Sequence, residues 1–335
     1  MRSTCLFLVL AMLFLQSCLK IESTSSSDHE IDSVSVDNMV TGLAAQQDQG
    51  YTSLTGKRLL SPELDRWSLM KRENELEEAY QNYLSYPDSL PMIYWYGRRL
   101  SYLYRYHESI QVYTAGLSKF PESYDLYRHR GHRYLTVRDI DHAIDDLEKA
   151  VFYVRDLPTI MEDDVVQNER NIPRSSVQFN IWYHLGLAYY IKGNFDKAVS
   201  AYKKCMLVAD NHDMLVSATH WLYMTYQKIG NTPAAERLLE PITPKMNIVD
   251  NESYHQLLLM YKGLYEPEKI YNVQDTDGEI SQLTLGYGVG NWYYNHGKPE
   301  QAIEVFEKMM ESPYWQAFGY LAAEVELANH TAVAG

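Results

Sequence analysis

The stretch NIWYHLGLAYYIKGNFDKAVSAYKKCMLVAD, residues 180–210, contains two apolar patterns separated by a short turn. Apolar and small residues recur at steps of three and four on either side of the turn, at Trp182, Leu185, Gly186 and Tyr189 and again at Phe195, Ala198, Tyr202 and Cys205. This spacing is the period of an α-helix with one buried face. Gly193 suits the left-handed residue that ends a helix, and Asn194 can cap the helix that follows. The stretch therefore predicts two closely packed helices joined by a tight turn.

The same pattern returns upstream with a period of 34 residues. Residues of similar size stand 34 apart in the pairs Gly97 and Gly131, Leu100 and Tyr134, Ser109 and Ala143, Tyr113 and Leu147, Gly116 and Ala150, and Pro87 and Pro121. A single helix pair cannot bury its apolar face alone, so such units stack on their neighbours. The period therefore predicts an array of helix pairs.

These residues resemble the tetratricopeptide repeat family, and the resemblance covers roughly residues 63 to 327. It implies an all-α fold, a right-handed superhelical solenoid of helix-turn-helix repeats, as the domain spanning 59–335. Full units are expected at 90–123, 124–157, 179–212, 216–249 and 283–316, with a degenerate unit at 250–282 that has too many helix breakers for a regular second helix. Helices at 63–85 and 315–328 are expected to cover the two ends.

One segment interrupts the repeat. Residues 158–178, PTIMEDDVVQNERNIPRSSVQ, shift the register by 21 residues and contain four acidic residues, two arginines and two prolines. We expect this insertion to be a surface loop, which is either functional or merely tolerated.

The N-terminus has the features of an export signal. The apolar run from Cys5 to Leu15 is too short to span a bilayer but fits the core of a signal peptide. The sequence LQSC, residues 15–18, resembles the lipobox of bacterial lipoproteins, which implies a signal peptide at 1–17 and a lipid on Cys18. Residues 18–58 are predicted to be a disordered tether. We therefore expect a protein lipid-anchored in the inner or outer membrane of a bacterial envelope, with its folded domain outside the cytoplasm.

The family resemblance also implies where a partner would bind. In tetratricopeptide repeats the first helices of successive units line a concave face, along which extended peptides or partner helices lie. The corresponding positions in this sequence are Tyr94, Arg98, Arg128, His132, Tyr183, Leu187, His220, Met224, Tyr287 and Asn291. The neighbouring aromatic residues of the first unit, Trp95 among them, are expected to be packing residues. A protein or peptide partner is thus expected along this face.

Charge is distributed unevenly along the chain. The formal net charge is −14, which disfavours nucleic acid as a partner, yet residues 90–157 contain ten basic and nine acidic residues. The basic residues concentrate in YRHRGHRY, residues 127–134. Arg128 and His132 would face the groove, where an arginine suits a carboxylate or phosphate of the partner. Arg130 would instead face inward and need an acidic partner, for which Asp141, Asp145 and Asp146 are candidates.

No catalytic motif, cofactor motif or metal-ligand spacing is present, so we predict a non-catalytic binding scaffold without a cofactor or metal. His129 and His132 could share a metal, but no third ligand follows at a recognisable spacing. Two alternatives remain open. One is an enzyme, in which Glu162, Asp163 or Asp164 of the insertion would converge on His132 or His184. The other is a purely structural spacer of the envelope.

Overall fold

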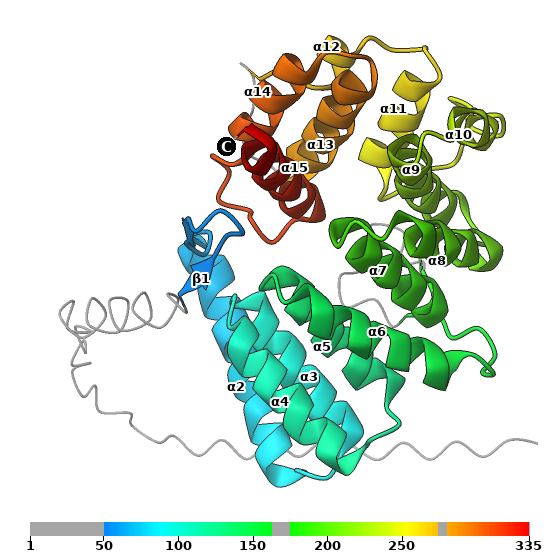
Figure 1. Ribbon diagram of the computed structural model, residues 1–335. Helices are drawn as coiled ribbons and strands as arrows, with labels where there is room; N and C mark the ends of the chain where they lie inside the picture. The colour runs from blue at the N-terminus through cyan, green and yellow to red at the C-terminus, as the bar shows by residue number, and fades with distance from the viewer. Residues whose placement is uncertain (1–49, 163–174, 274–279, 335) are drawn as a thin grey trace, which may run out of the picture. The chain divides into compact units, whose positions relative to one another are not determined.

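The computed structural model describes residues 50–162, 175–273 and 280–334, and these form an all-α solenoid of helix pairs (Figure 1). Cys18, the expected signal peptide and most of the expected tether lie outside the described residues. A helix α2 (Arg66–Ser85) precedes the pairs α3 (Leu90–Tyr102) with α4 (Tyr106–Lys119), α5 (Tyr124–Thr136) with α6 (Ile140–Val154), α7 (Val177–Ile191) with α8 (Phe195–Val208), and α9 (His212–Lys228) with α10 (Thr232–Leu239). The later helices are α11 (Glu252–Tyr261), the four-residue α12 (Pro267–Ile270), α13 (Ile280–Asn295), α14 (Pro299–Met309) and α15 (Phe318–Ala334). In this part of the chain no helix is both long enough and apolar enough to cross a membrane.

Three of the helix pairs share one packing feature. A glycine on the first helix faces a large ring sixteen residues later on the second helix, in the pairs Gly97 with Tyr113, Gly186 with Tyr202, and Gly290 with Phe306. A Cβ atom built on any of these glycines would lie 2.4 to 2.7 Å from the ring. The rings therefore fill the space that the missing side chains leave, which lets the paired helices approach closely.

The turns between paired helices contain one residue with a left-handed backbone conformation, which is a glycine in some turns and another residue in others. Glycines with positive φ, such as Gly193 and Gly230, provide it in later pairs, and an asparagine that follows caps the next helix. In the first two pairs Tyr104 and Arg138 take the same place, with φ of 60° and 69°. Such a conformation is uncommon for residues with a side chain, and both turns make contacts with segments far away in the sequence.

Those contacts join segments from the two ends of the described chain. A short hairpin of β1 (Tyr51–Thr52) and β2 (Arg58–Leu59) donates the Tyr51 hydroxyl to the Tyr104 carbonyl, 2.8 Å away. The guanidinium of Arg138 pairs with the carboxylate of Glu324 on α15 at 2.7 Å, with side chains only 5% and 1% exposed. The indole of Trp315 donates to the Leu60 carbonyl at 2.7 Å. The hairpin and α15 thus pack on the turns of the first two helix pairs.

The first helices of the later pairs also pack on one another, through tyrosines. The hydroxyl of Tyr183 on α7 lies 2.8 Å from that of Tyr254 on α11, and the hydroxyl of Tyr190 lies 2.7 Å from that of Tyr287 on α13. The indole of Trp221 on α9 donates to the Tyr183 hydroxyl at 2.7 Å. The inner side of these helices is therefore a hydrogen-bonded aromatic core.

Candidate functional site

The structure corrects the expected geometry of the concave face over its later units. The residues expected to line an open groove there are buried, with exposures of 7% or less, at Tyr183, Leu187, His220, Met224, Tyr287 and Asn291. Two contacts close this face: the tyrosine bridges between first helices, and α15, which packs against α7, α13 and α14 (Figure 1). A partner could reach these six side chains only if the helices separated.

The remaining four expected contacts lie on α3 and α5, and one of them is also corrected. Arg128 is 5% exposed and forms a two-pronged ion pair with Glu162, with Nη–Oε distances of 2.7 and 3.0 Å. Glu162 also accepts a hydrogen bond from the Asn180 amide at 3.0 Å. Arg128 is therefore not a free groove contact, because it joins α5 to the insertion and to α7. Tyr94, Arg98 and His132 are half-buried.

The ends of the insertion are held together where it leaves and rejoins the solenoid. Met161 and Ser176 pair as an isolated β-bridge, and the Gln178 side chain bonds both the Ile160 amide and the Pro158 carbonyl. These contacts place Glu162 beside α5. Asp163 and Asp164 lie outside the described residues.

A pocket of about 240 Å³ opens between α3, α5 and the base of the insertion. Its walls include the rings of Tyr94, Trp95 and Tyr124, with Asp125 and Glu162 as its acidic groups. Burial raises the pKa of Asp125; Arg128 opposes this shift and Glu162 adds to it. The pocket is thus mainly aromatic and apolar, with one half-buried carboxylate that lacks an ion pair among the described residues.

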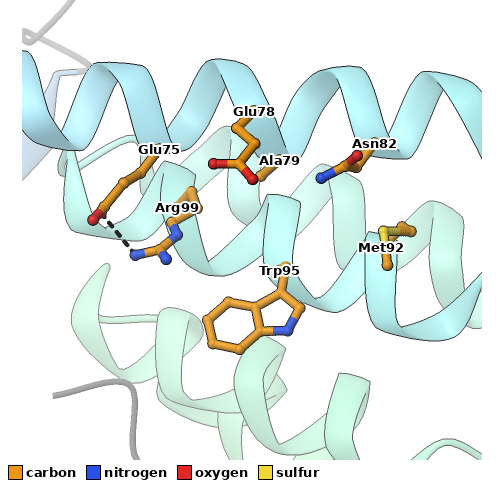
Figure 2. A pocket seen from close by; sticks show the side chains of 7 residues that line it. All are labelled: Glu75, Glu78, Ala79, Asn82, Met92, Trp95 and Arg99. Carbon is orange, nitrogen blue, oxygen red and sulfur yellow. Dashed lines mark hydrogen bonds and ion pairs between the residues drawn. The ribbon is translucent and has the colours of Figure 1, made fainter. Parts of the chain in front are cut away.

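A second pocket, of about 220 Å³, lies between α2 and α3 (Figure 2). Trp95 lines this pocket as well, together with Met92 and the ion pair of Arg99 with Glu75, whose N–O distance is 2.8 Å. The side chain of Glu78 also lines this pocket (Figure 2). Because both pockets share Trp95, we call them together the Trp95 surface. Sequence reasoning missed this role, because Trp95 is one of several neighbouring aromatic residues that were expected to be packing residues.

Beside the Trp95 surface lie three arginines, Arg98, Arg128 and Arg133, which we call the arginine cluster. Arg98 donates to the hydroxyls of Tyr94 and Tyr102, the second at 3.0 Å, and its guanidinium lies 5.2 Å from the Trp95 ring centre. Arg133 lies 5.2 Å from the ring centre of Tyr106, and burial lowers its pKa. Sequence reasoning missed Arg133, because its position in the repeat is not a groove position.

Two histidines border the cluster on the side of α15. The rings of His132 and His184 stack with centres 4.4 Å apart, and the ring of Phe318 packs against both. Burial lowers the pKa of His184 to about 3, with Arg128 and Arg133 adding to the shift. Burial also lowers the pKa of His132 well below its ordinary value, with Arg133 as the next cause. Both rings are therefore neutral near pH 7, and each can donate one N–H.

Residues 179–212, which form the pair of α7 and α8, match the family model of the tetratricopeptide repeat. The pair of α7 and α8 is therefore a tetratricopeptide repeat. Among solved structures, a tetratricopeptide repeat protein from Parabacteroides merdae is 16% identical, with a TM-score of 0.45 over 79% of this chain and 83% of its own. MamA is 14% identical, with a TM-score of 0.41 over 61% of this chain and all of its own. No curated protein matches the sequence significantly.

The tetratricopeptide units also account for the other basic and nucleophilic residues. Arg130 binds Asp146 through two bonds of 2.7 and 2.8 Å, which confirms the expected acidic partner on the neighbouring helix. The His129 ring lies 2.7 Å from the Arg128 guanidinium, and the described residues contain no group that could hold a metal. Cys205 is fully buried, and burial raises the pKa of its thiol well above the ordinary value. Glu162, the described acidic residue of the alternative enzyme site, is bonded to Arg128 and Asn180.

Proposed function

We propose that this tetratricopeptide repeat protein is a binding scaffold, lipid-anchored in a bacterial envelope through Cys18, which holds a protein segment at the Trp95 surface. The repeat fold supports a role in protein interaction. The observation that carries the location is that Trp95 lines two pockets on either side of α3, while the later part of the concave face is closed.

The chemistry of the Trp95 surface indicates what it would hold. Aromatic rings offer a large contact area, and Trp and Tyr are enriched where interfaces derive most of their binding energy. The partner segment would place an apolar or aromatic side chain in the pocket between α3 and α5. An anionic group of the same partner would lie near the arginine cluster, since Arg98 is one helical turn from Tyr94 on α3.

Site-directed photocrosslinking in cells tests the location. A photoreactive residue at Tyr124, on the wall of the larger pocket, should capture a defined partner, and Trp95→Ala should abolish that capture. The matched control is Trp67→Ala on α2, because that tryptophan is 77% exposed. If a folded Trp95→Ala variant still captures the partner, the Trp95 surface is not the binding site. Absence of any partner from this face would favour the structural spacer.

The lipid anchor needs a separate test. Metabolic labelling with a fatty acid should mark the wild-type protein, and Cys18→Ala should remove both the label and the association with membranes. An unlabelled wild-type protein would contradict the anchor while leaving the partner site unaffected.

A further inference from the structure

The arginine cluster contains more positive charge than the described residues neutralise. Arg128 is paired with Glu162, but Arg98 and Arg133 form no ion pair within the described part of the chain. Both residues are half-buried, Arg98 on α3 and Arg133 on α5. Two sheltered guanidiniums on neighbouring first helices therefore lack a counter-ion among the described residues.

Aromatic neighbours compensate this charge only in part. The rings of Trp95 and Tyr106 lie 5.2 Å from the guanidinium carbons of Arg98 and Arg133. Cation–π contacts are weaker than charge-assisted hydrogen bonds to an anion, since a ring carries no net negative charge. A sheltered cation without an anionic partner is unfavourable, and proteins normally provide one.

The third arginine of the cluster has a donor without a partner. The Nε atom of Arg128 is buried and has no hydrogen-bond partner, although the rest of this guanidinium is bonded to Glu162 and His129. Buried donors are almost always paired in folded proteins. Nearby, Arg98, His132 and Arg133 are half-buried rather than fully covered, so they retain access to solvent.

We propose that Arg98 and Arg133, with the N–H of His132, bind an oxyanion, either a carboxylate or a phosphate, on the inner face of α3 and α5. The planar fork of an arginine matches both groups through two parallel hydrogen bonds. The rest of the chain is acidic, so the site acts at short range and does not attract anions generally. This inference deepens the proposed function, because the oxyanion would belong to the partner held at the Trp95 surface.

The test measures thermal unfolding of the purified protein against inorganic phosphate, and against acetate, at constant ionic strength. Phosphate, acetate or both should raise the unfolding temperature of the wild type saturably, because a ligand that binds only the folded state stabilises it. Arg98→Gln and Arg133→Gln should each weaken the apparent affinity by about tenfold or more, as expected for loss of a charge-assisted bond. Arg155→Gln is the control, since Arg155 is exposed and pairs with its neighbour Asp156.

The unfolding temperature of the variants without added anion provides a second test, in which a binding site and a structural role predict changes of opposite sign. Arg133→Gln should unfold at a higher temperature than the wild type, because it removes a sheltered cation that has no counter-ion among the described residues. A purely structural arginine would instead lower the unfolding temperature when replaced. A response to phosphate alone assigns a phosphate ligand, a response to acetate alone assigns a carboxylate ligand, and a response to both assigns oxyanions in general.

Three results would overturn the proposal: no saturable effect of either anion, an equal effect in Arg98→Gln, or a less stable Arg133→Gln without anion. The Trp95→Ala variant separates this inference from the proposed function. It should lose the captured partner and still respond saturably to the anion, although with a changed affinity because the ring beside Arg98 is removed. Failure of one experiment therefore leaves the other informative.

Discussion

At the scale of single residues, the close approach of three helix pairs depends on glycines that face a large ring. Gly186 is helical, so its role is not a backbone conformation but the space that it leaves for Tyr202. A Cβ atom at this position would lie 2.7 Å from a carbon of that ring. Tyr202 is itself fully buried, which leaves the ring no free space to move into.

Gly186→Ala should therefore destabilise the protein by about 1–3 kcal/mol, the usual cost of overpacking a core. The sign of this change in the free energy of unfolding is informative. Alanine in a helix is intrinsically more favourable than glycine by about 1 kcal/mol, so helix propensity alone would stabilise the variant. Urea denaturation measures the effect, with Ser200→Ala on the exposed side of α8 as the control. Tyr202→Leu should relieve part of the loss in the double variant, and an unchanged urea midpoint for Gly186→Ala would contradict the packing.

At the scale of elements, the attachment of α15 depends on one buried ion pair. Glu324 accepts from both Nε and Nη2 of Arg138, at 3.1 and 2.7 Å, and also from the backbone N–H of Leu54. The pair thereby joins α15 to the turn between α5 and α6 and to the hairpin. Charged groups this deeply buried are unfavourable when either partner is missing.

Glu324→Gln should destabilise the protein by about 3 kcal/mol, because it leaves the Arg138 guanidinium buried without its counter-charge. Hydrogen exchange should show earlier opening of α15 than of α7. Arg138→Met combined with Glu324→Leu should lose less stability than the single change. Glu311→Gln is the control, since its pair with Lys308 is partly exposed and such pairs contribute about 1 kcal/mol or less. A loss equal to that of the control would show that this pair does not hold α15.

At the scale of the whole molecule, closure of the inner face buries ionisable side chains in neutral form. Burial lowers the pKa values of His184 and His220 to about 3, from an ordinary value of 6.5. The unfolded chain therefore binds protons that the folded chain does not bind between these two pH values. The free energy of unfolding must then fall as the pH is lowered through this window.

We expect the free energy of unfolding to decrease below pH 6.5 by up to about 1.4 kcal/mol per pH unit for each such histidine. His184→Asn and His220→Asn should each make the decrease between pH 6.5 and pH 5 less steep. Denaturant titrations across this range measure the slope. A slope that neither variant changes would show that these rings are protonated inside the folded protein.

Much of the fold and part of the site follow from local sequence. The 34-residue period places small and large residues at helical steps, and packing those steps requires a neighbouring unit, so the helix pairs are predictable. The acidic partner of Arg130 is predictable for a similar reason. A buried guanidinium needs a carboxylate, and the adjacent helix offers only a few.

By itself, the sequence determined that this protein is an array of paired helices and where most pairs lie, because helical periodicity and turn chemistry act over a few residues. Only the tertiary structure decided which face is accessible. The bond between Tyr190 and Tyr287 joins residues 97 apart, and the pair of Arg138 and Glu324 joins residues 186 apart. No local pattern predicts contacts between residues so far apart in the sequence, because these contacts depend on how small rotations between successive helix pairs accumulate. That accumulation buried six expected contacts and left Trp95 and the arginine cluster as the candidate site.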